Sequence, residues 1–101
     1  MGLGLALTEH HDIGDDRGLL MNASSLDYRI PTVLDVPQIE SLFVENSDGP
    51  GPYGSKGVGE GGVLAVAPAI AAAIADCTGV RLTTLPFTPE RILLAMQEDH
   101  S

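Results

Sequence analysis

The chain has 101 residues, 44% of them apolar, but only two tyrosines and two phenylalanines are aromatic and alanine and glycine supply much of the apolar share. Small side chains bury little area each, so the sequence predicts a single small domain, or part of a larger one that shares its core with other protein. Fourteen acidic residues against five basic ones give a net charge of −9, which disfavours binding to nucleic acid and to anionic membranes.

Three features of the sequence concern its cellular setting. Cys77 is the single cysteine, so the chain cannot form an internal disulfide, as expected in a reducing compartment. No basic region precedes an apolar stretch at the N-terminus, so we expect no secretory signal. The uncharged run from Gly61 to Ala75 is shorter than a bilayer span and contains Pro68, which favours a buried helix of a soluble protein. We therefore expect a cytoplasmic protein.

The first nine residues, Met1 to Glu9, are predicted to form a helix. Leu3 and Leu7 stand four residues apart and so lie on one helical face. No capping residue precedes this helix. We therefore expect the chain to begin inside a domain.

Histidines and acids follow the first helix. Adjacent histidines at positions 10 and 11 point in different directions on a helix end, and no further ligand stands at metal-binding spacing. A solvated helix end is the favoured interpretation. The residues 14–18 form a predicted turn. The acids in and before it are Asp12, Asp15 and Asp16, which offer too few ligands for calcium.

Two segments before residue 47 are predicted to be extended. Ser24 to Pro31 alternates apolar and charged side chains and ends at a proline, which indicates a short half-buried strand. Ile39 to Asn46 is apolar in its middle and flanked by acids, and it is the strongest strand candidate in the chain.

The strand candidate leads into the glycine loop, which we define as Gly49 to Gly62. Seven glycines and two prolines in these fourteen residues indicate a tightly turning, stiffened main chain that can lie close against another group. Its second half contains one acid, Glu60, and the only lysine of the chain, Lys56, stands four residues earlier. A stiff loop of this kind can direct a carboxylate toward a ligand.

The residues after the loop predict a helix, a strand and a second helix. Gly61 to Asp76 is apolar all round, so we expect a helix packed on every side, with Pro68 in the first turn of its second part. Gly79 is its predicted C-cap. Val80 to Leu85 is a predicted short strand.

The last helix begins at a capping threonine. Thr88 is the predicted N-cap and Pro89 the first helical residue. Ile92, Leu93 and Met96 form the predicted buried stripe. The element order is therefore helix, strands, glycine loop, buried helix, strand, helix, which predicts an α+β partial domain spanning residues 1–101.

Two interpretations of Glu60 follow from spacing alone. A carboxylate at a helix N-terminus is stabilised by about 0.3–1 kcal/mol, but this needs no flanking glycines. Flanking glycines keep side chains away from both sides of the carboxylate, as suits a catalytic group that meets a ligand. On spacing alone, capping and catalysis are equally supported.

The loop also formally matches the dinucleotide-binding pattern G-x-G-x-x-G over residues 57–62, with Asp76 about twenty residues on. The predicted strand ends well before these glycines, and Asp76 ends a helix instead of a second strand. A dinucleotide-binding module is therefore kept only as a further alternative, with retention of NAD or FAD as its signature.

Several motifs resemble one family in the same order. Gly-Pro-Tyr-Gly-Ser-Lys-Gly-Val-Gly-Glu at residues 51–60 resembles the C-terminal active-site segment of the molybdenum hydroxylases, the molybdopterin-binding large subunits of the xanthine dehydrogenase, aldehyde oxidase and carbon monoxide dehydrogenase family. The residues 2–9, 26–31, 35–37, 66–71 and 85–93 resemble other parts of the same segment. The likeness covers almost the whole chain, which is identified as a C-terminal part of a molybdopterin-binding domain.

The resemblance implies that Glu60 is the catalytic base, which takes a proton from a molybdenum-bound hydroxide during hydroxylation of an aldehyde or heteroaromatic carbon. It implies that Gly57, Val58 and Gly59 contact oxygens of the cofactor through their main-chain amides. It also implies that Gly2, in a helix beside the cofactor, contacts the cofactor. Lys56 either neutralises nearby negative charge or forms a salt bridge within the loop. No residue of this chain is expected to ligate the metal.

The resemblance also implies a shared active site. The cofactor is molybdenum–molybdopterin, with its cytosine dinucleotide form as one alternative, held together with the remainder of the molybdopterin-binding subunit. Iron–sulfur and FAD groups are expected on partner subunits, and the substrate is a small molecule. We expect the isolated chain to be inactive. A structural alternative is a chain that only packs against a partner subunit.

Overall fold

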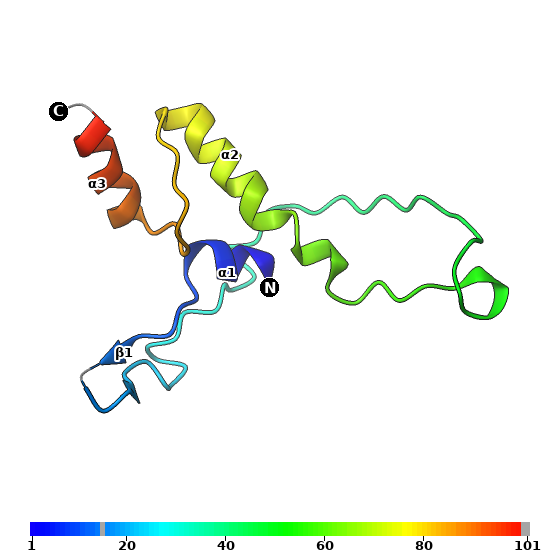
Figure 1. Cartoon of the computed structure of the whole chain (residues 1–101), viewed down its shortest axis with the longest axis horizontal. Helices are drawn as coiled ribbons and strands as arrows, with labels where there is room; N and C mark the ends of the chain where they lie inside the picture. Colours follow the sequence, from blue (N-terminus) through cyan, green and yellow to red (C-terminus); the bar gives the residue numbers. More distant parts are fainter. Residues whose placement is uncertain (15, 100–101) are drawn as a thin grey trace.

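The computed structural model describes residues 1–14 and 16–99, so Asp15 of the predicted turn lies outside the described residues. At its centre, α1 (Gly2–Leu7) packs against the start of α2 (Val66–Thr78). Between these two helices, the chain first passes through β1 and then leaves the centre as a long arm and returns, as Figure 1 shows in teal and green. The molecule is elongated, with principal extents of 55 × 37 × 27 Å.

The buried core of the described chain is small. Its apolar members are Ala6, Val80 and Phe87. The backbone N–H of Phe87 donates to the carbonyl of Ala6 at 2.7 Å, which ties the segment before the last helix to α1. The exposed surface is 8601 Å², whereas a compact monomer of this mass exposes about 5,400 Å². This excess agrees with the expectation that the chain shares its core with other protein.

A two-stranded antiparallel ladder forms where the sequence predicted only a turn. β1 (Ile13–Gly14) pairs with β2 (Leu19–Leu20), with Ile13 opposite Leu20. The buried side chain of Asn22 holds its base, because it donates to the carbonyl of His10 at 2.7 Å and accepts from the N–H of Asp12 at 2.9 Å.

The three predicted strands are wrong for the chain as the structure describes it. Residues 24–28 form a turn, residues 29–31 have no regular structure, and residues 39–46 and 80–85 belong to no ladder. A strand needs a neighbouring strand to pair its backbone groups, and within residues 1–14 and 16–99 only β1 and β2 pair with each other. The side chains of residues 39–46 therefore favour a strand, but the described chain offers no strand for them to pair with.

The apolar run after the glycine loop folds in two parts, as Pro68 predicted. A 3₁₀ turn, η2 (Gly61–Val63), precedes α2, and Pro68 lies in the first turn of α2. Gly79 ends α2 in the left-handed conformation with φ 79°, and its N–H donates to the carbonyl of Ala75 at 2.9 Å. Both predictions are confirmed.

The expectation that this helix is packed on every side is wrong for the described chain, because no residue of α2 is buried. By length and composition alone, Gly61–Thr78 could cross a membrane, with a mean hydropathy of 1.6. However, its continuous α-helix has only 13 residues. Such a helix is about 20 Å long, shorter than the roughly 30 Å of a bilayer core.

The last helix, α3 (Pro89–Asp99), starts where predicted. The hydroxyl of Thr88 accepts from the N–H of Arg91 at 3.3 Å, and the helix continues from Pro89. The predicted buried stripe is only partly present. Ile92 and Met96 are half-buried, whereas Leu93 is exposed, because no second layer covers that side of α3 in the described chain.

Candidate functional site

The first half of the glycine loop, residues 49–55, is closed on itself. Gly49 donates its N–H to the carbonyl of Gly54 at 3.1 Å, and a 3₁₀ turn, η1 (Pro52–Gly54), forms the tip. Gly54 has φ 76°, and a Cβ at this position would overlap the carbonyl oxygen of Ser47. Glycine is therefore required here by the fold of the loop itself.

The second half of the loop has no such internal requirement for glycine. Its glycines are Gly57, Gly59, Gly61 and Gly62. A Cβ added at any of them would have no atom within 4 Å beyond its chain neighbours, and none has a positive φ. These residues line, with Val58 and Glu60, an open depression of about 630 Å³. Their lack of side chains creates a bare surface that the loop does not need for its own packing.

Glu60 lies in this bare surface, directly before η2. Its backbone carbonyl accepts from the N–H of Val63 at 3.0 Å, but its side chain makes no capping hydrogen bond. The carboxylate is exposed and has no ion-pair or hydrogen-bond partner among the residues that the structure describes. The local geometry therefore does not support the interpretation of Glu60 as a capping side chain, and it leaves the carboxylate open to an external group.

Lys56 does not pair with Glu60. Its ammonium nitrogen lies 2.6 Å from Oδ1 of Asp48, and both side chains are exposed. Of the two roles considered for Lys56, the structure shows a local salt bridge, made to the residue directly before the loop. A contact between Lys56 and a cofactor stays a prediction.

Gly2 has a packing role. It is buried at the start of α1, and a Cβ at this position would lie 2.7 Å from the Cβ of Val66 in α2. The close approach of the two helices therefore accounts for glycine here. Gly2 thus lies against the beginning of α2, while Glu60 lies before η2, which leads into the same helix. A cofactor contact of Gly2 is a prediction that this packing neither supports nor opposes.

The structure does not support the dinucleotide-binding alternative, because the elements that flank such a motif are absent around residues 57–62. That motif requires a strand before its first glycine and an α-helix opening at its last. Here residues 55–58 belong to no strand, and a 3₁₀ turn follows Glu60. Asp76 lies within α2. Among the described residues no group of three or more histidines, cysteines or acids is placed to hold a metal ion. The interpretation of the histidine pair as part of a helix end is wrong, because α1 ends at Leu7 and has no basic residue in its last turn.

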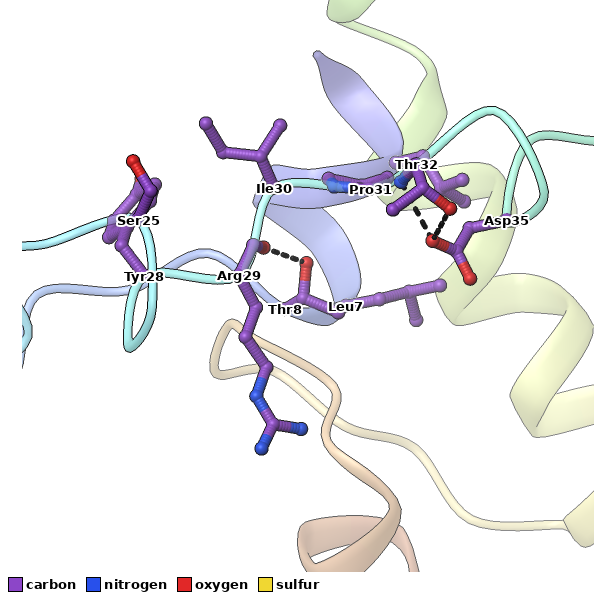
Figure 2. Close-up of a pocket in the computed structure, with 10 residues that line it drawn as sticks. Leu7, Thr8, Ser25, Tyr28, Arg29, Ile30, Pro31, Thr32 and Asp35 are labelled. Atoms are coloured by element: carbon purple, nitrogen blue, oxygen red, sulfur yellow. Dashed lines mark hydrogen bonds between the residues drawn. The ribbon is translucent and has the colours of Figure 1, made fainter.

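A second concavity, of about 610 Å³, lies between α1 and the segment 25–35. Figure 2 shows how hydrogen bonds hold its wall: the hydroxyl of Thr8 donates to the carbonyl of Arg29 at 2.7 Å. The N–H and hydroxyl of Thr32 donate to Oδ2 of Asp35 at 2.7 and 2.8 Å, which lowers the pKa of that carboxyl. The side chain of Arg29 extends away from the other lining side chains (Figure 2).

Three side-chain hydrogen bonds between α1 or the residues after it and later segments had no signal in the sequence. They are Thr8 to Arg29, Tyr28 to Glu9, and Asn22 to His10, and their partners stand 21, 19 and 12 residues apart. Helical or strand periodicity relates only residues a few positions apart. Pairs at these separations become visible only in the folded chain.

The pair of Tyr28 and Glu9 leads to a test at high pH. The phenol of Tyr28 donates to Oε2 of Glu9 at 2.9 Å, and this carboxylate raises the pKa of Tyr28 above its usual 10.0. Glu9→Gln should therefore lower the pKa of Tyr28, because a neutral amide holds the phenolic proton less strongly. Titration of tyrosinate absorbance in a Tyr53→Phe background measures it.

The sign of the linkage follows from the direction of this shift. The stabilising contribution of Tyr28 is fully present below its ordinary pKa and is lost as the pH rises through the raised value. Glu9→Gln should remove that part of the pH dependence of unfolding, whereas Glu98→Gln on α3 should leave it. An unchanged titration midpoint in Glu9→Gln contradicts the pairing.

Comparison with known proteins identifies relatives of almost the whole chain. The xanthine dehydrogenase molybdenum-binding subunit of Escherichia coli O157:H7 is 45% identical over 92 residues, which are 91% of this chain and 12% of that protein. The aldehyde oxidoreductase molybdenum-binding subunit PaoC of Escherichia coli K12 is 36% identical over 94 residues, 92% of this chain and 13% of that protein. No family model matches the sequence.

A solved structure agrees with these sequences. Quinoline 2-oxidoreductase from Pseudomonas putida 86 superposes with a TM-score of 0.79 at 37% identity, over 96% of this chain and 13% of that one. The chain is homologous to a segment of the molybdenum-binding subunits of xanthine dehydrogenases and aldehyde oxidoreductases.

The family resemblance of the motifs is thereby confirmed, and so are the helices and the mixed character of the fold. The chain spans 12–13% of the length of the relatives named here. The family members it resembles are oxidoreductases, and one further relative is named as subunit gamma of a 6-hydroxypseudooxynicotine dehydrogenase complex.

Proposed function

We propose that the chain supplies Glu60 as the catalytic base of a molybdenum hydroxylase that oxidises an aldehyde or a heteroaromatic carbon. The observation that carries this proposal is an unpaired carboxylate set in a bare surface whose glycines have no packing reason within the described chain. The names of the relatives supply the class of enzyme and the metal. Glycine at four of six positions costs backbone entropy, and an external group that approaches closely would account for that cost.

The bare surface suits a large anionic cofactor. The backbone N–H groups of Gly57, Val58 and Gly59 have no hydrogen-bond partner in residues 1–14 and 16–99, and no neighbouring side chain obstructs them. Free amides of this kind are ready donors to anionic oxygens. Molybdenum–molybdopterin, with or without the cytosine dinucleotide, would therefore be held here together with the remainder of the subunit. When bound, it supplies the Lewis-acid and two-electron redox chemistry of the oxidation.

The role of Glu60 in this proposal is to accept a proton. Its ionised carboxylate accepts a proton on one side-chain oxygen from the oxygen nucleophile that attacks the electrophilic substrate carbon. The flanking glycines leave both faces of the carboxylate free for this approach. Lys56 carries a positive charge in the same loop, which the carboxylate of Asp48 offsets.

The active site is shared in this proposal. The remainder of the molybdopterin-binding subunit completes the pocket, and iron–sulfur and flavin subunits carry the electrons onward, in the cytoplasm. A piece covering 12% of a relative's length contains few of its residues, so the isolated chain should bind no cofactor and show no turnover.

A chimeric subunit tests the proposal directly. In it, this chain replaces the matching 92 residues of the xanthine dehydrogenase molybdenum-binding subunit of Escherichia coli O157:H7. We expect the chimeric subunit to contain molybdenum and to oxidise xanthine, and the isolated chain to do neither. A chimeric subunit that folds and contains molybdenum but is inactive would favour the structural alternative, in which the chain only packs against the rest. The large exposed surface of the chain is the observation behind that alternative.

The two halves of the glycine loop should respond differently to an added side chain. Gly59→Val should leave the secondary structure of the free chain unchanged, since a Cβ at Gly59 has open space around it. In the chimeric subunit it should lower the molybdenum content at least about tenfold, or about 1.4 kcal/mol of binding free energy. Gly54→Val is the matched control, because it should distort the loop in the free chain already. Equal molybdenum content in the Gly59→Val and unchanged chimeric subunits contradicts the cofactor contact.

A further inference from the structure

The arm, residues 37–62, has an outgoing leg with unsatisfied backbone groups. This leg, residues 38–46, runs in an extended course away from α1 and α2 (Figure 1). None of its backbone N–H or carbonyl groups has a hydrogen-bond partner within the part of the chain that the structure describes. Leu42 and Val44 are each 93% exposed and Phe43 is 87% exposed. Extended backbone beside bulky apolar side chains is the chemistry of a β-strand that lacks its sheet.

We propose that the outgoing leg is an interaction strand, which adds to a β-sheet of the polypeptide that supplies the rest of the molybdenum-binding subunit. This inference rests on the proposed function for the nature of that polypeptide. Because successive side chains of a strand point to opposite faces, the run of Leu42, Phe43 and Val44 places apolar groups on both faces. The receiving sheet should therefore be covered on both sides where this strand lies.

The exposed area argues for a large and permanent partner. The surface of the chain exceeds that of a compact monomer of its mass by roughly 3,000 Å². Obligate interfaces bury about 2,000–5,000 Å² summed over both partners, whereas weaker complexes bury less. An excess of this size on one partner alone is therefore in the range of an obligate interface. The matching segment of quinoline 2-oxidoreductase has a similar conformation within a chain of which it is only 13%. The conformation of the arm is thus one that the rest of such a subunit accommodates.

Charge and backbone chemistry make two other partners of the outgoing leg unfavourable: a second copy of this chain and a lipid bilayer. A second copy would bring a further net charge of −9 against this one. The outgoing leg itself carries Glu40 and Glu45 and no base, so basic side chains are expected beside the receiving sheet edge. A lipid bilayer cannot satisfy free backbone groups. A strand of another protein segment satisfies them directly.

The interaction strand would also fix the position of residues 56–62, the part of the arm that returns to α2 and contains Glu60. Residues 38–46 and 56–62 are joined through the closed tip of the glycine loop, where the backbone bonds of Gly49 restrict movement. Pairing the outgoing leg with a sheet would therefore hold Glu60 at one place relative to the partner polypeptide. An unpaired arm would leave the carboxylate unplaced.

The experiment uses two polypeptides: this chain, and the Escherichia coli O157:H7 molybdenum-binding subunit from which the matching 92 residues have been deleted. Association is measured by light scattering, and amide hydrogen exchange follows each part of the chain. We expect a one-to-one complex in which the amides of residues 39–46 exchange at least about tenfold more slowly than in the free chain. A complex without protection at these residues, or no complex, overturns the proposal, as does equal protection on self-association or on anionic vesicles.

Two neighbouring proline substitutions sharpen the result. Successive N–H groups of a strand point to opposite sides, so Phe43→Pro and Val44→Pro together remove one donor on each side. At least one should weaken association about tenfold or more, whereas the controls Phe43→Leu and Val44→Thr, which keep the N–H, should stay within about threefold. The free chain should be unaffected, because both residues are exposed in it. Equal affinities of all four variants contradict strand pairing.

The outcome is separable from that of the proposed function. Association and exchange are measured without cofactor or turnover, whereas Glu60 is tested in one continuous chimeric subunit that needs no association. If the proline variants associate normally and the Glu60 variant is inactive, only the interaction strand is contradicted. If the proline variants fail to associate and the Glu60 variant is active, only the catalytic proposal is contradicted.

Discussion

Glu60→Gln in the chimeric subunit is expected to lower kcat by about 10²–10⁴-fold, the usual effect of removing a general base. Glutamine keeps the size of the side chain and removes its ability to accept the proton. The carboxylate is exposed and makes no hydrogen bond within the described chain, so the substitution breaks no contact seen here. Molybdenum content and thermal stability should therefore stay unchanged while turnover falls.

The control for this substitution is Glu98→Gln on α3, an exposed glutamate outside the glycine loop. It removes the same charge and should leave kcat unchanged. If the two variants retain equal turnover, Glu60 is not the base. If Glu60→Gln loses molybdenum together with activity, its role is in holding the cofactor.

Phe87→Ala should destabilise the free chain by about 3 kcal/mol, the lower part of the range for truncating a buried phenylalanine. Phe87 is only 4% exposed and belongs, with Ala6 and Val80, to the small buried core of the described chain. Its backbone bond to Ala6 joins the segment before α3 to α1. A core this small provides a low free energy of unfolding, so circular dichroism should show loss of helix at a markedly lower urea concentration.

Phe43→Ala provides the matched comparison, because it removes the same ring from a position that is 87% exposed. In the free chain it should shift the unfolding midpoint very little. Similar shifts in the two variants would mean that the segment around Phe87 does not pack on α1 as the structure shows.

The helix ends were predictable because their causes are local. A capping hydroxyl at Thr88, a proline in the first turn at Pro89 and a left-handed glycine at Gly79 act within one turn of chain. The break of the apolar run at Pro68 has the same origin. The motif around Glu60 was also recognisable, since its residues are contiguous in the sequence.

The predicted strands and the burial of α2 depended on neighbours that the sequence pattern does not name. Residues 39–46 have the composition of a strand, but pairing needs backbone groups from another segment, and the described chain offers none. Leu93 and α2 are exposed for the same reason. Composition predicts that these surfaces are covered by other protein, but it does not indicate which segment covers them.

The sequence by itself determined the family, the helix ends and the presence of a glycine-rich loop with one carboxylate in its second half, because each depends on residues close together in the chain. Only the tertiary structure decided which glycines the loop needs for itself, that Lys56 pairs with Asp48 instead of Glu60, and that Gly2 serves the packing of α1 on α2. Those facts depend on distances that the folded chain sets, between residues that no helical or strand periodicity relates.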